Sequence, residues 1–166
     1  INDELVAAWG NLVNRVIAMT SKYFDGVIPE KGALSDVDIE ALDGREKVLS
    51  DVGDALDAVR LRGGIGRAME SAQAANVYLN ELEPWRTAKT DMERTGTSLA
   101  VALDMIATTA VVLSPYLPTT SARVLETLGL DIPERGPDWA VPEIAAGTKL
   151  GPLGPLFSKV ELEDED

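Results

Sequence analysis

The stretch LAVALDMIATTAVVL, residues 99–113, most restricts what this chain can fold into. It is apolar on nearly every side, and a helix of that kind has to be buried over most of its surface. We expect this helix to run from about Glu93 to Leu113 and to stop at SPYLP, because proline cannot continue a helix. The chain therefore needs other helices around this one, which predicts an all-α bundle.

The surrounding helices are visible as segments with helical apolar spacing. Asn2 and Ser35 are the expected N-caps of the first two helices, and Val59 closes the apolar stripe of the second. RGG at 62–64 is predicted to be a helix–helix turn, and PWRTAK at 84–89 a turn or a single-turn helix. In chain order, and besides the apolar helix, we expect helices over about residues 2–24, 35–61, 65–82 and 119–128.

The C-terminal part has a different composition. Seven of the nine prolines lie from Ser114 onward, and TKLGPLGPLFSKV, residues 148–160, is predicted to lie extended across the bundle as an irregular strap. The last six residues, ELEDED at 161–166, contain five acids and are expected to be a disordered acidic tail. We therefore place one helical domain over residues 1–160.

Composition excludes several kinds of function. The chain has no cysteine and no histidine, which removes disulfides, Cys/His zinc sites, thiol nucleophiles and histidine-based catalytic triads. A net charge of −13 counts against a nucleic acid partner. The charge is unevenly distributed, however. The segment from Arg60 to Arg94 contains six basic and five acidic residues, so it is not acidic overall. No apolar run approaches the ~18 residues that a membrane span needs, so we expect no membrane partner.

The first helix carries a polar edge that could face RNA. On a helical wheel Asn11 and Arg15 lie one turn apart, away from the apolar side, and Lys22 follows two turns later on the same edge. An amide and a guanidinium in this arrangement can hydrogen-bond to the edges of unstacked bases. The alternative is a polar face that is merely hydrated.

A second candidate is Trp85, which follows a proline at the end of a helix. Arg86 and Lys89 lie within four residues of it, and a tryptophan beside cations at a corner is suited to stacking on a base. The alternative is that the ring folds inward and caps the bundle.

No motif for catalysis is present. The acidic spacing in DVDIEALD, residues 36–43, is typical of a solvated helix face. RGGIG at 62–66 lacks the Lys-Ser/Thr of a phosphate-binding loop and the spacing of a dinucleotide fingerprint. We therefore expect no active site within this chain.

Five motifs in order along the chain resemble one known family. They are GNLVNR at 10–15, KYFDGVIP at 22–29, PWRTAK at 84–89, VVLSPYLPTTSARVLETLG at 111–129 and GPLFSKVE at 154–161. Together they resemble the anticodon-binding domain of methionyl-tRNA synthetase, a class I aminoacyl-tRNA synthetase. The resemblance covers nearly the whole chain and implies a helical bundle of the class I anticodon-binding type.

The resemblance also implies a function and its residues. In that family the residues that match Asn11, Arg15 and Trp85 read the CAU anticodon of tRNA(Met), with the tryptophan stacked on the first anticodon base. We expect Pro84, Lys22, Arg86 and Lys89 to support that surface. This chain should supply recognition alone and bind no cofactor or metal itself.

The family's catalytic domain would precede residue 1. That domain ligates methionine to tRNA with ATP and holds zinc where zinc is present, and its HIGH and KMSKS signatures do not occur here. The catalytic domain of the same polypeptide is thus an expected partner, and the expected location is the cytoplasm.

Two other interpretations stay open at this point. The chain could be the equivalent domain of a class I synthetase for valine, isoleucine, leucine or cysteine, or it could be a helical protein-interaction scaffold without an RNA role. An exposed Trp85 ring near Asn11 and Arg15 would favour RNA binding, whereas a ring buried in the bundle would favour the scaffold.

Overall fold

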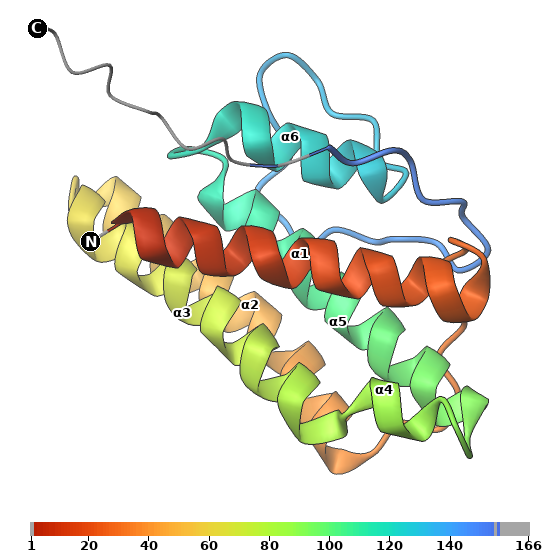
Figure 1. Ribbon diagram of the computed structural model, residues 1–166. Helices are drawn as coiled ribbons and strands as arrows, with labels where there is room; N and C mark the ends of the chain where they lie inside the picture. The colour runs from red at the N-terminus through yellow and green to blue at the C-terminus, as the bar shows by residue number, and fades with distance from the viewer. Residues whose placement is uncertain (1, 155, 157–166) are drawn as a thin grey trace, which may run out of the picture.

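The computed structural model describes residues 2–154 and 156, with side chains described from Ala7 onward. Within this part of the chain six helices pack into a bundle around a central helix, α5 (Figure 1). In chain order they are α1 (Asn2–Phe24), α2 (Asp36–Asp57), α3 (Leu61–Leu82), α4 (Pro84–Thr87), α5 (Met92–Leu113) and α6 (Pro118–Thr127). The all-α fold predicted from the sequence is confirmed. The side chain of Asn2, the expected N-cap of α1, lies outside the described ones.

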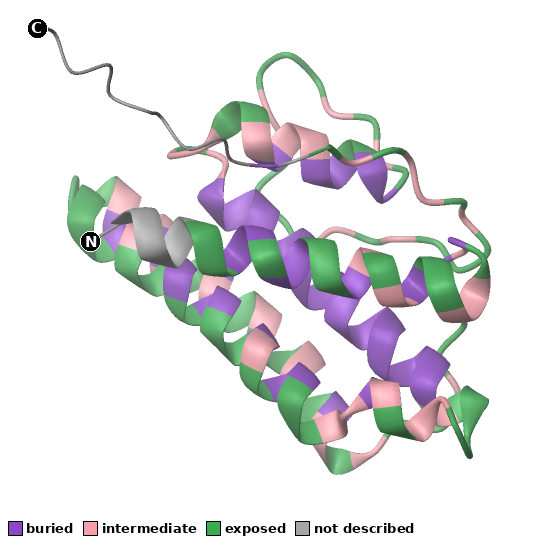
Figure 2. Ribbon diagram, viewed as in Figure 1, coloured by how far each residue is buried: buried purple, intermediate pink, exposed green. Residues whose placement is uncertain are grey.

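Helix α5 is the element on which the other helices pack. It contacts each of the other five, and every residue from Thr95 to Leu113 is buried (Figure 2). Leu103 and Ile106 are fully inaccessible to solvent. By length and apolar content α5 could cross a membrane, contrary to the expectation from the sequence, but its apolar window is 100% buried inside the bundle. It is therefore the core helix around which the domain is built.

The polar residues of α5 are compatible with this burial because their hydroxyls are satisfied within the protein. Thr108 and Thr109 donate to the carbonyls of Asp104 and Met105, one turn earlier, at 3.1 and 2.9 Å. The Thr109 hydroxyl also lies 2.7 Å from that of Ser71, which joins α5 to α3. The buried hydroxyls thus add a cross-link between helices rather than an uncompensated cost.

The turn between α2 and α3 differs from the prediction. It lies at residues 58–60, and the RGG segment forms the first turn of α3 instead. Val59 makes the reversal with a φ of 57° and is 78% exposed, so it does not belong to the apolar stripe of α2. A left-handed conformation costs a residue of this type roughly 1–2 kcal/mol. Gly64, predicted to lie in the turn, is instead required inside α3, because a Cβ there would collide with the hydroxyl of Tyr116.

The described residues that follow α6 form no helix and run back over the bundle towards the end of α1 (Figure 1). Val27 and Lys149 form an isolated antiparallel bridge, and the amide of Ile28 donates to the carbonyl of Thr148 at 2.9 Å. Trp139 donates its indole N–H to the carbonyl of Leu49 in α2 at 3.0 Å. These contacts hold the segment against α2 and against the loop that follows α1. The predicted tail at 161–166 lies outside the described residues.

Candidate nucleic-acid interface

Trp85 is carried by the single-turn helix α4, and one residue sets the direction of that helix. Glu83 alone separates α3 from α4 and has a left-handed φ of 46°. Its carbonyl accepts hydrogen bonds from the amides of Arg86 and Thr87 at 2.8 and 3.2 Å, which closes the turn of α4. Pro84 is buried and stands in the first turn, where a missing N–H costs nothing. The corner therefore presents Trp85 in a defined direction.

A pair of threonines holds α4 against the core. The hydroxyls of Thr87 on α4 and Thr95 on α5 lie 2.6 Å apart. Thr95 is fully buried and also donates to the carbonyl of Asp91 at 3.0 Å. Because Thr87 is only two residues beyond Trp85, this contact ties the corner to the buried helix α5.

Arg15 of α1 lies over the ring of Trp85. The guanidinium carbon is 4.6 Å from the ring centroid, within cation–π range. Its Nη1 also donates to the side-chain oxygen of Asn80 on α3, at a long 3.4 Å. One exposed side chain of α1 thus meets both α3 and α4. Trp85 itself is half-buried, with part of its ring packed against the core.

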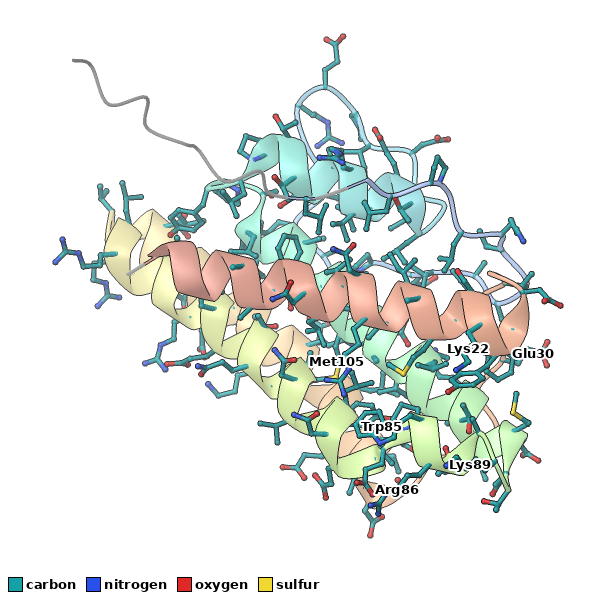
Figure 3. All side chains as sticks on the ribbon, in the orientation of Figure 1. Lys22, Glu30, Trp85, Arg86, Lys89 and Met105 are labelled. Atoms are coloured by element: carbon teal, nitrogen blue, oxygen red, sulfur yellow. The ribbon has the colours of Figure 1, made fainter. Side chains whose placement is uncertain are left out.

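A shallow pocket of about 290 Å³ opens beside the Trp85 ring. Met19 and Tyr23 give it apolar and aromatic walls, while Arg15 and Lys22 supply two cations. The Lys22 ammonium lies 5.3 Å from the centroid of the Tyr23 ring. In Figure 3 Trp85 lies between α1 and α4, and Lys22 lies near the end of α1. The arrangement offers a flat, apolar surface bordered by positive charge, which suits a base and its phosphate.

The other expected residues are placed less centrally. Asn11 is exposed one turn before Arg15 on α1 and does not line the pocket. Arg86 pairs with Glu83 at 3.3 Å and points away from α1, towards the end of the bundle (Figure 3). Lys89 is exposed beyond α4. Arg15, Lys22 and Trp85 are therefore brought together, whereas Arg86 and Lys89 lie at the margin.

Reasoning from the sequence did not select Asn80, Met19 and Tyr23. Met19 and Tyr23 follow Arg15 at intervals of four residues, so helical spacing alone places them on its side of α1. That signal could have identified them. Asn80 belongs to another helix, and no local pattern indicates that it meets Arg15.

The acidic segment 36–43 is not simply a solvated face. Asp38 is fully buried. Its two carboxylate oxygens accept hydrogen bonds from Nη1 and Nη2 of Arg94, each at 2.8 Å, which makes a bidentate ion pair. The Tyr78 hydroxyl donates to the same carboxylate at 2.5 Å, and so does the Ser35 amide, at 2.8 Å, as part of a capping box. The cap predicted at Ser35 is thus confirmed, and the buried carboxylate joins α2, α3 and α5 at the end of the bundle that carries α4.

The pKa values in this cluster reflect those contacts. Burial by itself raises the pKa of Asp38, but hydrogen bonds from Arg94, Tyr78 and Ser35 outweigh it and lower the pKa to about 2. Burial, followed by the hydrogen bond to Asp38, raises the pKa of Tyr78 well above its ordinary value. Asp38 is therefore ionised and Tyr78 neutral at neutral pH. Among the described residues no group of three or more metal-ligating side chains comes together.

Comparison with known proteins identifies the family. Residues 28–166 match the family described as the anticodon binding domain of methionyl tRNA ligase. The chain belongs to this family. Its first helix, with Asn11 and Arg15, precedes the matched residues but is included in the alignments with whole relatives.

Two curated relatives illustrate the similarity. The methionine–tRNA ligase of Pyrococcus abyssi is 38% identical over 160 residues, which cover 96% of this chain and 22% of that protein. The methionine–tRNA ligase of Bacteroides fragilis is 40% identical over 164 residues, covering 96% of this chain and 24% of that protein. The chain therefore spans less than a quarter of the length of these relatives.

A solved structure has the same fold. The apo form of Mycobacterium tuberculosis methionyl-tRNA synthetase superimposes with a TM-score of 0.87 at 25% identity, over 97% of this chain and 33% of that one. The matched family and these relatives are named for methionine, which favours the methionyl family over the valine, isoleucine, leucine and cysteine synthetases.

Proposed function

We propose that this chain recognises the CAU anticodon of tRNA(Met), with Trp85 stacking on the first anticodon base and Asn11 and Arg15 hydrogen-bonding to base edges. The observation that carries the proposal is the contact of Arg15 with Trp85, beside a shallow pocket that has a second cation at Lys22. Membership of the anticodon-binding family supports it independently.

The contact between Arg15 and Trp85 suggests how a base would enter. In the free chain the guanidinium covers one face of the indole ring. A cation–π contact at an exposed site is worth about 0.5–1 kcal/mol, whereas stacking of a base on an aromatic ring is worth about 1–3 kcal/mol. A base can therefore displace Arg15 from the ring, and the released guanidinium is then free to donate to the edge of a base.

The remaining residues have supporting roles in this proposal. Buried Pro84 and the Thr87–Thr95 contact keep the tryptophan in position, which lowers the ordering cost of binding. Lys22 lies beside the pocket, and Lys89 is exposed past α4, so both can neutralise phosphates near the loop.

By the same proposal the chain works as part of a longer protein. Its partner would be the catalytic domain of the same polypeptide, which ligates methionine to tRNA with ATP and holds zinc where zinc is present. The cytoplasm is the proposed location. The chain described here would contribute selection of the tRNA rather than a chemical step.

The test is a titration at low salt with an RNA hairpin that bears CAU. Binding is monitored through the tryptophan fluorescence of the protein. A matched hairpin with the first anticodon base changed serves as the competitor. We expect the CAU hairpin to bind at least about tenfold more tightly, a difference of about 1.4 kcal/mol. Trp85→Ala should weaken binding of the CAU hairpin by about 1–3 kcal/mol, the value of one stacked base. Because this variant lacks the reporting tryptophan, its affinity and that of the wild type are compared by the fluorescence anisotropy of a labelled hairpin.

Two controls make the result specific. Trp9 is fully buried and Trp139 is 40% exposed on the side of α2, so Trp139→Phe should lower the background signal without changing affinity. Equal binding of the two hairpins would show that the chain binds RNA without selecting the CAU anticodon. A folded chain that binds neither hairpin would contradict the proposal and favour the protein-interaction module.

A further inference from the structure

One flank of α3 faces α1, and a hydrogen bond between the two helices identifies it. Asn80 accepts a hydrogen bond from Arg15 of α1, so the side of α3 that carries Asn80 is turned to α1. Arg62 lies eighteen residues earlier, which is five turns of an α-helix, and so it shares that side. Figure 1 shows the N-terminal ends of α1 and α3 near each other, at the opposite end from α4. Between Arg62 and Asn80 this flank carries Gly66, Gln73 and Asn76, which reach the surface, and Met69, which is buried.

This flank contains no acid. The two acids of α3, Glu70 and Glu81, line a groove of about 520 Å³ on the other side, towards α2. On α1, Asn11, Arg15 and Lys22 are exposed, and the stretch from Ala7 to Lys22 that contains them also has no acidic residue. For a chain with a net charge of −13 this is a marked separation. We call Asn11, Arg15, Lys22, Arg62, Gln73 and Asn80 the α1–α3 surface.

We propose that the α3 part of the α1–α3 surface, Arg62, Gln73 and Asn80, binds the sugar-phosphate backbone of the RNA stem that carries the anticodon loop, with Arg62 as its far anchor. This inference rests on the proposed function, because a loop placed at Trp85 is what directs the stem towards α3. Arg62 lies about 27 Å from Asn80 along the helix axis, at 1.5 Å per residue. The surface therefore extends well beyond the pocket at Trp85.

The chemistry of the surface favours an RNA backbone. Amide side chains can donate to phosphate oxygens and ribose hydroxyls, and such contacts orient a nucleic acid without reading its sequence. Arg62 is exposed and makes no ion pair with another described residue, so its charge is available. A protein partner would need apolar anchors. The exposed apolar side chain in the second half of α3, Val77, instead borders the groove towards α2.

The test compares two charge reversals on the same helix. Arg62→Glu changes the α1–α3 surface, whereas Arg67→Glu changes the α2 side of α3, where Arg67 pairs with Glu70 at 3.2 Å. Both variants alter the net charge equally, so any difference between them is local. Each is titrated with a CAU hairpin that has the full anticodon stem and with the CAU loop sequence as a linear oligonucleotide, at several salt concentrations.

We expect Arg62→Glu to weaken hairpin binding about tenfold and to lower the slope of log affinity against log salt by about 0.9 or more, the loss of one phosphate contact. Its affinity for the linear loop should stay within about twofold of wild type, as should both affinities of Arg67→Glu. Equal losses in the two variants, or an unchanged hairpin affinity in Arg62→Glu, would overturn the stem-binding proposal. If the wild-type chain did not prefer CAU in either RNA, the proposed function itself would fail, which is a distinct result.

Discussion

The two flanks of α3 are built from the same helix but differ in chemistry. Towards α2 the surface is a groove with paired charges, including Arg67 with Glu70 at 3.2 Å and Lys47 with Asp51 at 2.5 Å. Towards α1 the exposed positions are amides and cations, and Arg15 contacts both Asn80 and Trp85.

The difference shows how an acidic chain can still present a surface suited to RNA. Electrostatic attraction of a phosphate is screened within about 10 Å at ordinary ionic strength, so the local distribution of charge matters more than the total. The two acids of α3, Glu70 and Glu81, line the groove towards α2 and not the α1–α3 surface. The net charge of −13 therefore does not describe what an RNA would meet at α1.

The largest effect is expected in the core that both flanks share. Leu103 is fully buried in α5, and Leu103→Ala should lower the free energy of unfolding by about 2–5 kcal/mol through lost burial and the cavity it leaves. Denaturant unfolding measures this change. RNA affinity of the folded variant should stay within about twofold, because both flanks remain in place. A loss below about 1 kcal/mol would contradict the central position of α5.

Acid should weaken the bundle end where α2, α3 and α5 meet. The pKa of Asp38 is lowered to about 2, so its contribution to stability is present above its ordinary pKa near 3.8 and is lost as the pH falls through about 2. The shift corresponds to about 2 kcal/mol. Unfolding curves at pH 5 and pH 2 measure it, with Asp38→Asn as the reference that cannot titrate.

The wild-type chain should lose more stability than Asp38→Asn over this interval, because only the wild type has a carboxylate to protonate there. Equal losses would show that the remaining carboxylates account for the whole acid sensitivity. In that case the Asp38–Arg94 pair would not be the feature that holds this end together.

The smallest effect, and the sharpest comparison, comes from adjacent residues on opposite flanks. Gln73 is exposed on the α1 side and Ala74 on the groove side. Gln73→Glu should weaken hairpin binding about two- to fourfold, since it adds a negative charge near phosphates, whereas Ala74→Glu should leave it almost unchanged. Affinity at low salt measures both. Equal effects would mean that the two flanks do not differ for RNA.

Much of the architecture follows from local patterns. The central helix, the cap at Ser35, the short helix at Pro84 and the polar edge of α1 all depend on spacing and residue type within one segment. Arg15 and Trp85 could each be selected as candidates for the same reason.

What local patterns do not contain is the partner from another helix. The turn lies at Val59 rather than at the glycines, and Gly64 instead packs within α3 beneath Tyr116. Asp38 looked solvated in its own segment, yet Arg94 and Tyr78 enclose it. In each case residues far apart in the sequence decide the outcome, and only the packed bundle brings them together.

The most direct test of the account uses the three tryptophan indole N–H signals in a two-dimensional NMR spectrum, assigned by substitution to phenylalanine. Trp9 is in the core, Trp139 is held on α2 and Trp85 is in the candidate interface. On addition of the CAU hairpin the Trp85 signal should shift or broaden strongly, while the Trp9 and Trp139 signals stay close to their free positions. If the RNA binds and Trp85 does not respond, or if Trp139 responds as strongly, the interface has been placed on the wrong side of α3.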